Sequence, residues 1–251
     1  GKPDLAVAKW YDSTVGVLIN DGTGKLAAAV DYAVGSAPKA VEAADLNGDG
    51  KLDLVVANYY SDSVSVLLNA GDGTYGPSVP YPTAMGPYAV AAADLNGDGK
   101  QDLGVIGYYG AASVLLNNGD GTFAAKVDYT AGASPPDIEA GDVNGDGKID
   151  LVFTNTAPDN SLGVLINKGD GSFNAMVQYP CGPGGVSLSL ADLNGDGKLD
   201  VAVANFYTDS ASVLLNAGNG GFAAPQAYPT DIGPWGLDVA DLNGDGHPDL
   251  V

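Results

Sequence analysis

The chain has 251 residues, enough for one large domain or two small ones, and 45% of them are hydrophobic, so a packed core can form. It holds 31 acidic residues against 10 basic ones, all of them lysine, for a net charge of −21. Nucleic-acid binding requires a basic surface, so this composition argues against that class of function. The sequence has no apolar run long enough to span a membrane, and its single cysteine, Cys181, has no disulfide partner within the chain.

A nine-residue motif, Asp-x-Asn-Gly-Asp-Gly-x-x-Asp, occurs five times at an almost constant spacing. The copies start 49, 48, 50 and 49 residues apart, at Asp45, Asp94, Asp142, Asp192 and Asp241. Five such copies do not arise by chance, so the chain is a tandem array that forms a single repeat domain over residues 1–251. The predicted units are residues 1–44, 45–93, 94–141, 142–191 and 192–240, with a partial unit over 241–251.

Each unit contains four short β-like runs. In chain order around the second copy of the motif, these runs are residues 88–93, 102–107, 112–116 and 123–129. They are rich in aliphatic and β-branched residues and are bounded by turn residues, whereas no segment has helical periodicity over a helical length. A Gly-Asp-Gly turn, typical of a hairpin, separates the third run from the fourth.

Four antiparallel strands in about 49 residues predict the blade of a β-propeller. A sheet of this size exposes two apolar faces, and radial stacking of such sheets buries both. We therefore expect an all-β fold, a propeller of four-stranded antiparallel blades with about five repeats, and a linear β-solenoid is the alternative. The chain begins within a copy of the motif and ends at 249–251, shortly after another, so we expect it to be a segment of a larger propeller.

The nine-residue motif places oxygen-bearing side chains at positions 1, 3, 5 and 9, and position 7 adds its backbone carbonyl. All of these donors are hard oxygens, a set that selects Ca²⁺, and the carboxylates would repel one another without a cation. The alternative is that the motifs are plain hairpin turns. The predicted calcium ligands are Asp45, Asn47, Asp49, Lys51, Asp53, Asp94, Asn96, Asp98, Lys100, Asp102, Asp142, Asn144, Asp146, Lys148, Asp150, Asp192, Asn194, Asp196, Lys198, Asp200, Asp241, Asn243, Asp245, His247 and Asp249.

These motifs, over essentially the whole chain, resemble the FG-GAP/VCBS repeat family, the calcium-binding β-propeller blades of integrin α subunits, bacterial surface proteins and some fungal lectins. The Gly-Asp-Gly-x-Phe turn is closest to the bacterial VCBS copies. The resemblance implies that the motif joins the first two strands of each blade and binds Ca²⁺, up to about five ions in all, one per repeat. It also implies a secreted or cell-surface location.

The loop after the second run carries a pair of aromatic residues in most units, such as Tyr59-Tyr60, whereas one unit has Thr156-Ala157 instead. A ring of aromatic side chains on one face would bind sugars or a protein, with Tyr88 and Trp235 on a neighbouring rim. The alternative is that the first residue of each pair wedges between blades. The candidate ligand-binding residues are Trp10, Tyr11, Tyr60, Tyr109 and Tyr207.

We therefore predict a non-enzymatic, extracellular, calcium-binding propeller that recognises carbohydrate or protein on the cell surface or matrix. Catalysis lacks a visible set of residues, because His247 is the only histidine and nearly all close aspartate pairs belong to the motifs. Two alternatives stay open. One is a structural spacer that self-associates through open terminal strands into filaments, and the other is a polysaccharide-active enzyme.

Overall fold

The computed structural model describes residues 2–251, so Gly1, the first residue of the first predicted unit, lies outside the described residues. The described part of the chain is all β, with 21 strands in six sheets. The strands, sheet by sheet, are β1 (Leu5–Lys9), β2 (Thr14–Leu18), β3 (Val30–Ala33); β4 (Pro38–Ala44), β5 (Asp53–Asn58), β6 (Ser63–Leu67), β7 (Val79–Pro82); β8 (Pro87–Ala93), β9 (Asp102–Gly107), β10 (Ala111–Leu115), β11 (Val127–Thr130); β12 (Ile138–Gly141), β13 (Asp150–Asn155), β14 (Ser161–Leu165), β15 (Val177–Pro180); β16 (Gly185–Ala191), β17 (Asp200–Asn205), β18 (Ser210–Leu214), β19 (Gln226–Pro229); β20 (Val239–Ala240), β21 (Asp249–Leu250). Over these residues, no helix is long and apolar enough to cross a membrane.

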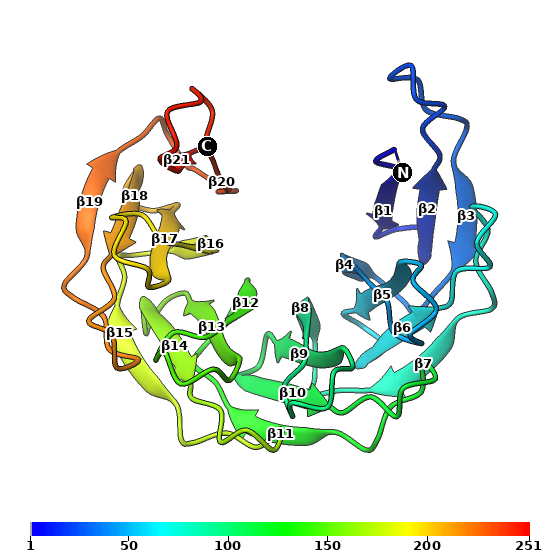
Figure 1. Ribbon diagram of the computed structural model, residues 1–251, viewed down its shortest axis with the longest axis horizontal. Helices are drawn as coiled ribbons and strands as arrows, with labels where there is room; N and C mark the ends of the chain where they lie inside the picture. The colour runs from blue at the N-terminus through cyan, green and yellow to red at the C-terminus, as the bar shows by residue number, and fades with distance from the viewer. Residues whose placement is uncertain (1) are drawn as a thin grey trace.

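The sheets stand side by side around an arc, as the blades of a propeller do (Figure 1). Within each sheet the strands pair antiparallel in chain order, with β4, β8, β12 and β16 toward the centre and β7, β11, β15 and β19 at the rim. This arrangement confirms the predicted all-β fold of antiparallel, four-stranded blades, although the first and last sheets have three strands and two.

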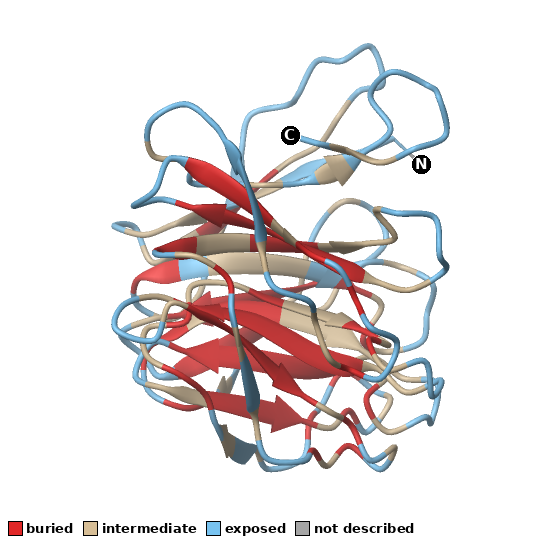
Figure 2. Ribbon diagram, turned by 90° about the vertical axis from the view of Figure 1, so that its left-hand side faces the viewer, coloured by how far each residue is buried: buried red, intermediate tan, exposed pale blue. Residues whose placement is uncertain are grey.

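Antiparallel connectivity separates the loops into two sets at opposite ends of the strands. The aspartate motifs follow the first strand of each blade and the Gly-Asp-Gly turns follow the third, so both lie at one end. The aromatic loops follow the second strand, and the linkers between blades follow the fourth, so both lie at the other end. We call these two ends the aspartate face and the aromatic face. Figure 2 shows the exposed loops projecting from the buried strands.

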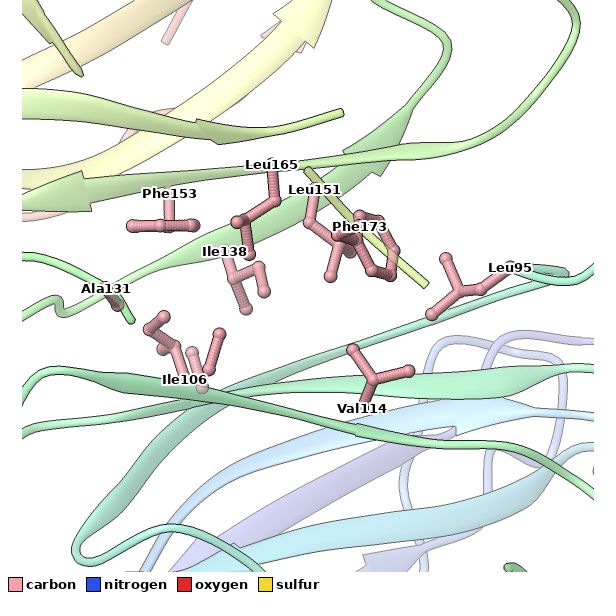
Figure 3. Close-up of a cluster of buried hydrophobic side chains, with 11 residues drawn as sticks. Leu95, Ile106, Val114, Ala131, Ile138, Leu151, Phe153, Leu165 and Phe173 are labelled. Carbon is pink, nitrogen blue, oxygen red and sulfur yellow. The ribbon is translucent and has the colours of Figure 1, made fainter. Parts of the chain in front are cut away.

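The hydrophobic core lies between neighbouring sheets. Ile106 and Val114 of one sheet point toward Leu151, Phe153 and Leu165 of the next, and none of these side chains is more than 2% exposed (Figure 3). Strands β5, β9, β13 and β17 are buried along their whole length, because sheets cover both of their faces. This burial explains the nearly continuous apolar runs of the sequence.

Strand ends differ from the prediction mainly in the fourth run of each unit. The predicted run 123–129 becomes β11, Val127–Thr130, while Phe123 forms only an isolated bridge with Asn117. The ring of Phe123 instead packs edge-on against Tyr81 of the preceding blade, at 5.3 Å between ring centroids. Phe123, which was predicted to begin a strand, therefore packs between two blades.

Candidate functional site

The five aspartate loops share one hydrogen-bond pattern. In the loop after β8, Asp94 Oδ1 accepts from the backbone N–H of Gly97 and Oδ2 from that of Gly99, both at 2.8 Å. Asn96 Oδ1 accepts from the N–H of Asp98 at 2.9 Å. Gly97 and Gly99 have φ angles of 78° and 82°, a region that favours glycine, so they allow this turn. The same aspartate contacts recur at Asp45, Asp142, Asp192 and Asp241.

The ninth residue of the motif is a buried carboxylate at the start of the second strand. Asp102 Oδ2 accepts from the N–H of Leu95 at 3.0 Å, and Oδ1 accepts from that of Asn117 at 2.7 Å, so one side chain ties the loop to the following turn. Burial raises the pKa of Asp102, and the other two aspartates of its loop raise it further. The same causes raise the pKa of Asp150 to about 6. In these two loops the carboxylates therefore repel one another, and a bound cation would relieve that repulsion.

The lysine at position 7 reaches back to the aspartate at position 5 in four loops. Lys100 Nζ lies 3.0 Å from Asp98 Oδ2, and the equivalent pairs span 2.8 to 3.2 Å. The lysine stem also covers the next turn, since a Cβ added to Gly119 would lie 2.7 Å from Lys100 Cε. Only the carbonyl of this residue was predicted to act, although a lysine two positions after the same aspartate in four copies was the signal for an ion pair.

The loops fit Ca²⁺ by the chemistry of their donors, which are three carboxylates, an amide oxygen and a backbone carbonyl. The predicted ligands of each loop lie within one short turn, but many of their oxygens accept from backbone N–H groups. Across residues 2–251, no three His, Cys, Asp or Glu side chains gather closely enough to form a metal site. Calcium binding therefore stays a prediction.

In three of the glycine turns, the asparagine at the start of the turn joins neighbouring blades, a role that was not predicted from the sequence. Asn117 Nδ2 donates to the carbonyl of Leu46 at 2.9 Å and to that of Gln101 at 2.8 Å. Leu46 belongs to the aspartate loop of the preceding blade, whereas Gln101 belongs to the same blade as Asn117. Asn167 and Asn216 make equivalent pairs of bonds. The signal in the sequence was the asparagine that recurs at this point of every unit.

The aromatic loops expose the second residue of each predicted pair. The side chain of Tyr11 is 95% exposed, and those of Tyr60, Tyr109 and Tyr207 are 66 to 68% exposed. Trp10, the first residue of its pair, is partly buried and contacts Tyr60 at 5.5 Å between ring centroids. The second residues are therefore the ones available to a ligand.

The aromatic side chains form two separate groups. The first aromatic patch consists of Trp10, Tyr59, Tyr60, Tyr88, Tyr108 and Tyr109, whose rings contact one another across three sheets at 5.1 to 6.3 Å. A hydrogen bond of the Tyr59 hydroxyl to Tyr109, together with burial, raises the pKa of Tyr59 to about 12. The second aromatic patch is Phe206, Tyr207 and Trp235. The blade between them carries Thr156 and Ala157, so the predicted ring is interrupted there.

Two carboxylates outside the motifs lie near the centre of the arc. Glu42 of β4 and Glu139 of β12 line a cavity of about 280 Å³ on either side of β8. Burial is the largest cause that raises the pKa of Glu139 to about 7. Neither residue was predicted as a site residue, although they are the only two glutamates in the sequence.

A family model described as FG-GAP-like repeat matches residues 1–56, 45–105, 94–153, 142–203 and 192–251, which together cover the whole chain. The chain belongs to the FG-GAP-like repeat family. This match confirms the resemblance that the aspartate motifs predicted, but it does not separate the bacterial VCBS copies from the other FG-GAP-like repeats. A search of curated proteins found no match to the sequence.

Solved structures with low sequence identity share the fold of these FG-GAP-like repeats. A lectin from Agrocybe aegerita that recognises non-reducing terminal N-acetylglucosamine aligns with a TM-score of 0.63 and 20% identity, over 99% of this chain and 73% of the lectin chain. A candidate 6-phosphogluconolactonase from Bacteroides fragilis aligns with a TM-score of 0.72 and 15% identity, over 99% and 70% of the two chains. The periplasmic gluconolactonase of Pseudomonas aeruginosa aligns with a TM-score of 0.68 and 19% identity, over 99% and 69%.

The two lactonase structures correct the prediction that the protein is not an enzyme. That prediction was wrong because it took the lack of a familiar catalytic set outside the aspartate motifs as evidence against catalysis. Two proteins that are named as lactonases share the blade arrangement over 99% of this chain. The pair formed by Glu42 and Glu139 was also overlooked, since the two residues are almost a hundred positions apart in the sequence.

Proposed function

We propose that this FG-GAP-like repeat protein recognises carbohydrate through the first aromatic patch, outside the cell, on a scaffold that Ca²⁺ stabilises. The observation that carries the proposal is the placement of the exposed rings of Tyr60 and Tyr109 on adjacent blades within one continuous aromatic surface. Flat aromatic rings stack on the apolar faces of sugars. Because neighbouring rings already hold these side chains, little side-chain entropy is lost when a ligand binds.

The lectin from Agrocybe aegerita supports a sugar as the ligand, because it has this fold and recognises N-acetylglucosamine. The aspartate loops support the proposed calcium, because each concentrates three carboxylates, and at Asp102 the two other aspartates of the loop contribute to a raised pKa. Open loops of this kind suit the millimolar Ca²⁺ found outside cells, which supports an extracellular location.

A glycan array with matched variants tests the proposal. The unaltered protein is expected to bind at least one glycan, and Tyr60→Ala is expected to abolish binding while the fold is retained. Tyr228→Ala is the control, since Tyr228 is an exposed tyrosine in the outer strand β19, away from both aromatic patches. Equal binding by the two variants, or no glycan bound by the unaltered protein, would contradict carbohydrate recognition at this patch.

A further inference from the structure

Lys39 lies within the first aromatic patch, where it contacts rings instead of a carboxylate. Its Nζ is 4.4 Å from the ring centroid of Tyr88 and 5.1 Å from that of Trp10. Lys39 is the second residue of β4, at the end of the strand that meets the aromatic face. Six lysines of the described chain form salt bridges, and Lys39 is not among them. Its positive charge is therefore not neutralised.

Two carboxylates toward this end of the strands have other partners, and Asp12, which follows Trp10 and Tyr11 in its loop, forms no salt bridge with Lys39. Asp62, on the aromatic loop of the same sheet, accepts the backbone N–H of Gly86 at 2.8 Å. Asp31 of the neighbouring sheet pairs with Lys9 at 2.5 Å. These contacts keep both carboxylates in structural roles, so the ammonium of Lys39 stays available to a ligand.

The large negative charge of the chain lies mostly at the other end of the strands. Each of the five motifs places three aspartates on the aspartate face, and four of the glycine turns add another. A strand of six residues separates the faces by about 20 Å, which exceeds the screening length of about 8 Å at physiological ionic strength. The net charge of −21 therefore does not prevent an anion from approaching Lys39.

We propose that Lys39 makes the first aromatic patch selective for a sugar that carries a carboxylate, specifically a hexuronate unit of a polysaccharide. This inference rests on the proposed function, because it names the class of sugar that the patch binds. The rings stack on the sugar face, and the ammonium donates a charge-assisted hydrogen bond to the sugar carboxylate. Lys39 itself is exposed, and cation–π contacts at exposed positions are weak, so the ammonium can turn from the rings to the stronger partner when the ligand arrives.

The test compares hexuronate oligosaccharides with the same oligosaccharides after methyl esterification, which removes only the charge. The unaltered protein is expected to bind the free acid about tenfold more tightly than the ester, and the preference is expected to shrink as salt is added. Lys39→Met keeps the aliphatic stem and removes the charge, so it should lose the preference and still bind the ester. Lys39→Arg should retain the preference. Lys25→Met is the control, since Lys25 is an exposed lysine in a turn on the aspartate face that forms no salt bridge within the described chain.

The outcomes separate this inference from the proposed function. Binding to neutral glycans alone, lost in Tyr60→Ala and unchanged in Lys39→Met, would overturn the selectivity and leave carbohydrate recognition standing. Loss of ester binding in a folded Lys39→Met variant would show that Lys39 only supports the rings, which also overturns the inference. Failure to bind any glycan, acidic or neutral, would overturn both.

Discussion

The environment of Glu139 predicts how the stability of the protein depends on pH. The carboxylate of Glu139 is half-buried and accepts the backbone N–H of Leu190 at 2.9 Å, and burial is the main cause that raises its pKa to about 7. In the unfolded chain the pKa of a glutamate is about 4.3, so between these two values the folded protein binds the proton more tightly. The stability that this group contributes is therefore present at low pH and is lost as the pH rises through about 7.

Glu139→Gln removes the charge and keeps an acceptor for Leu190. We expect the variant to exceed the unaltered protein in free energy of unfolding by about 1–2 kcal/mol at pH 8, and by much less at about pH 5. Urea unfolding at both pH values measures the difference. A difference between the two proteins that does not change with pH would contradict the raised pKa.

Asn117 tests the connection between blades. Asn117→Ala removes the side-chain donor to the carbonyls of Leu46 and Gln101, and only Leu46 keeps a second donor, the N–H of Gly121, so we expect the free energy of unfolding to fall by about 1–3 kcal/mol. The matched control is Asn69→Ala, because Asn69 Nδ2 donates to the backbone of its own blade alone, at Leu52. Equal losses in urea unfolding of the two variants would show that the bond to the neighbouring blade contributes nothing.

The residues of the site differ in how well the sequence predicts them. The motif that includes Asp94 and Asp102 is local, so its spacing identifies the loop and its donors without a structure. Asn117 and Lys39 act on groups from other units, such as the carbonyl of Leu46, and no local pattern specifies such a contact. The enzyme prediction failed for the same reason, because it searched for catalytic groups close together in the sequence.

At the scale of elements, the repeats were well predicted because strand pairing within a blade is sequential. The limits of β9 were predicted to the residue, and β10 shifted by one. The missed features are contacts between blades, as at Phe123, where a bridge to Asn117 replaces the expected start of a strand. Periodicity alone does not report which blade a buried side chain touches.

Strands β13 and β14 show a compensated exchange between paired residues. Phe153 pairs with Gly163, where the other full blades pair a valine with a serine, as in Val56 and Ser65. A Cβ on Gly163 would overlap the ring of Phe153, so the glycine makes room for the larger side chain.

A double-mutant cycle tests this exchange. We expect Gly163→Ser alone to lower the free energy of unfolding by about 2 kcal/mol or more, and Phe153→Val alone to cost about 1–3 kcal/mol for the cavity it leaves. The double variant restores the pair found in the other blades, so its loss should be clearly smaller than the sum. Additive losses would contradict the proposed compensation.

At the scale of the whole molecule, calcium should stabilise all the blades together. With free Ca²⁺ tenfold above the dissociation constant, each occupied loop adds about 1.4 kcal/mol to the free energy of unfolding. We expect the melting temperature of the unaltered protein to rise with Ca²⁺ and to fall with a chelator. The melting temperature of Asp98→Ala should rise less with Ca²⁺, and in chelator it should be close to that of the unaltered protein. A melting temperature that does not change with Ca²⁺ would contradict the proposal that Ca²⁺ stabilises the blades.

The two proposed binding sites lie on opposite faces of the molecule. The aspartate face holds the loops proposed to bind Ca²⁺, and the aromatic face presents the rings proposed to bind sugar. A crystal structure with a bound oligosaccharide and Ca²⁺ tests this division most directly. The account predicts that a sugar ring stacks on Tyr60 or Tyr109, next to Lys39. A sugar held among the aspartate loops, or in the central cavity beside Glu42 and Glu139, would contradict it.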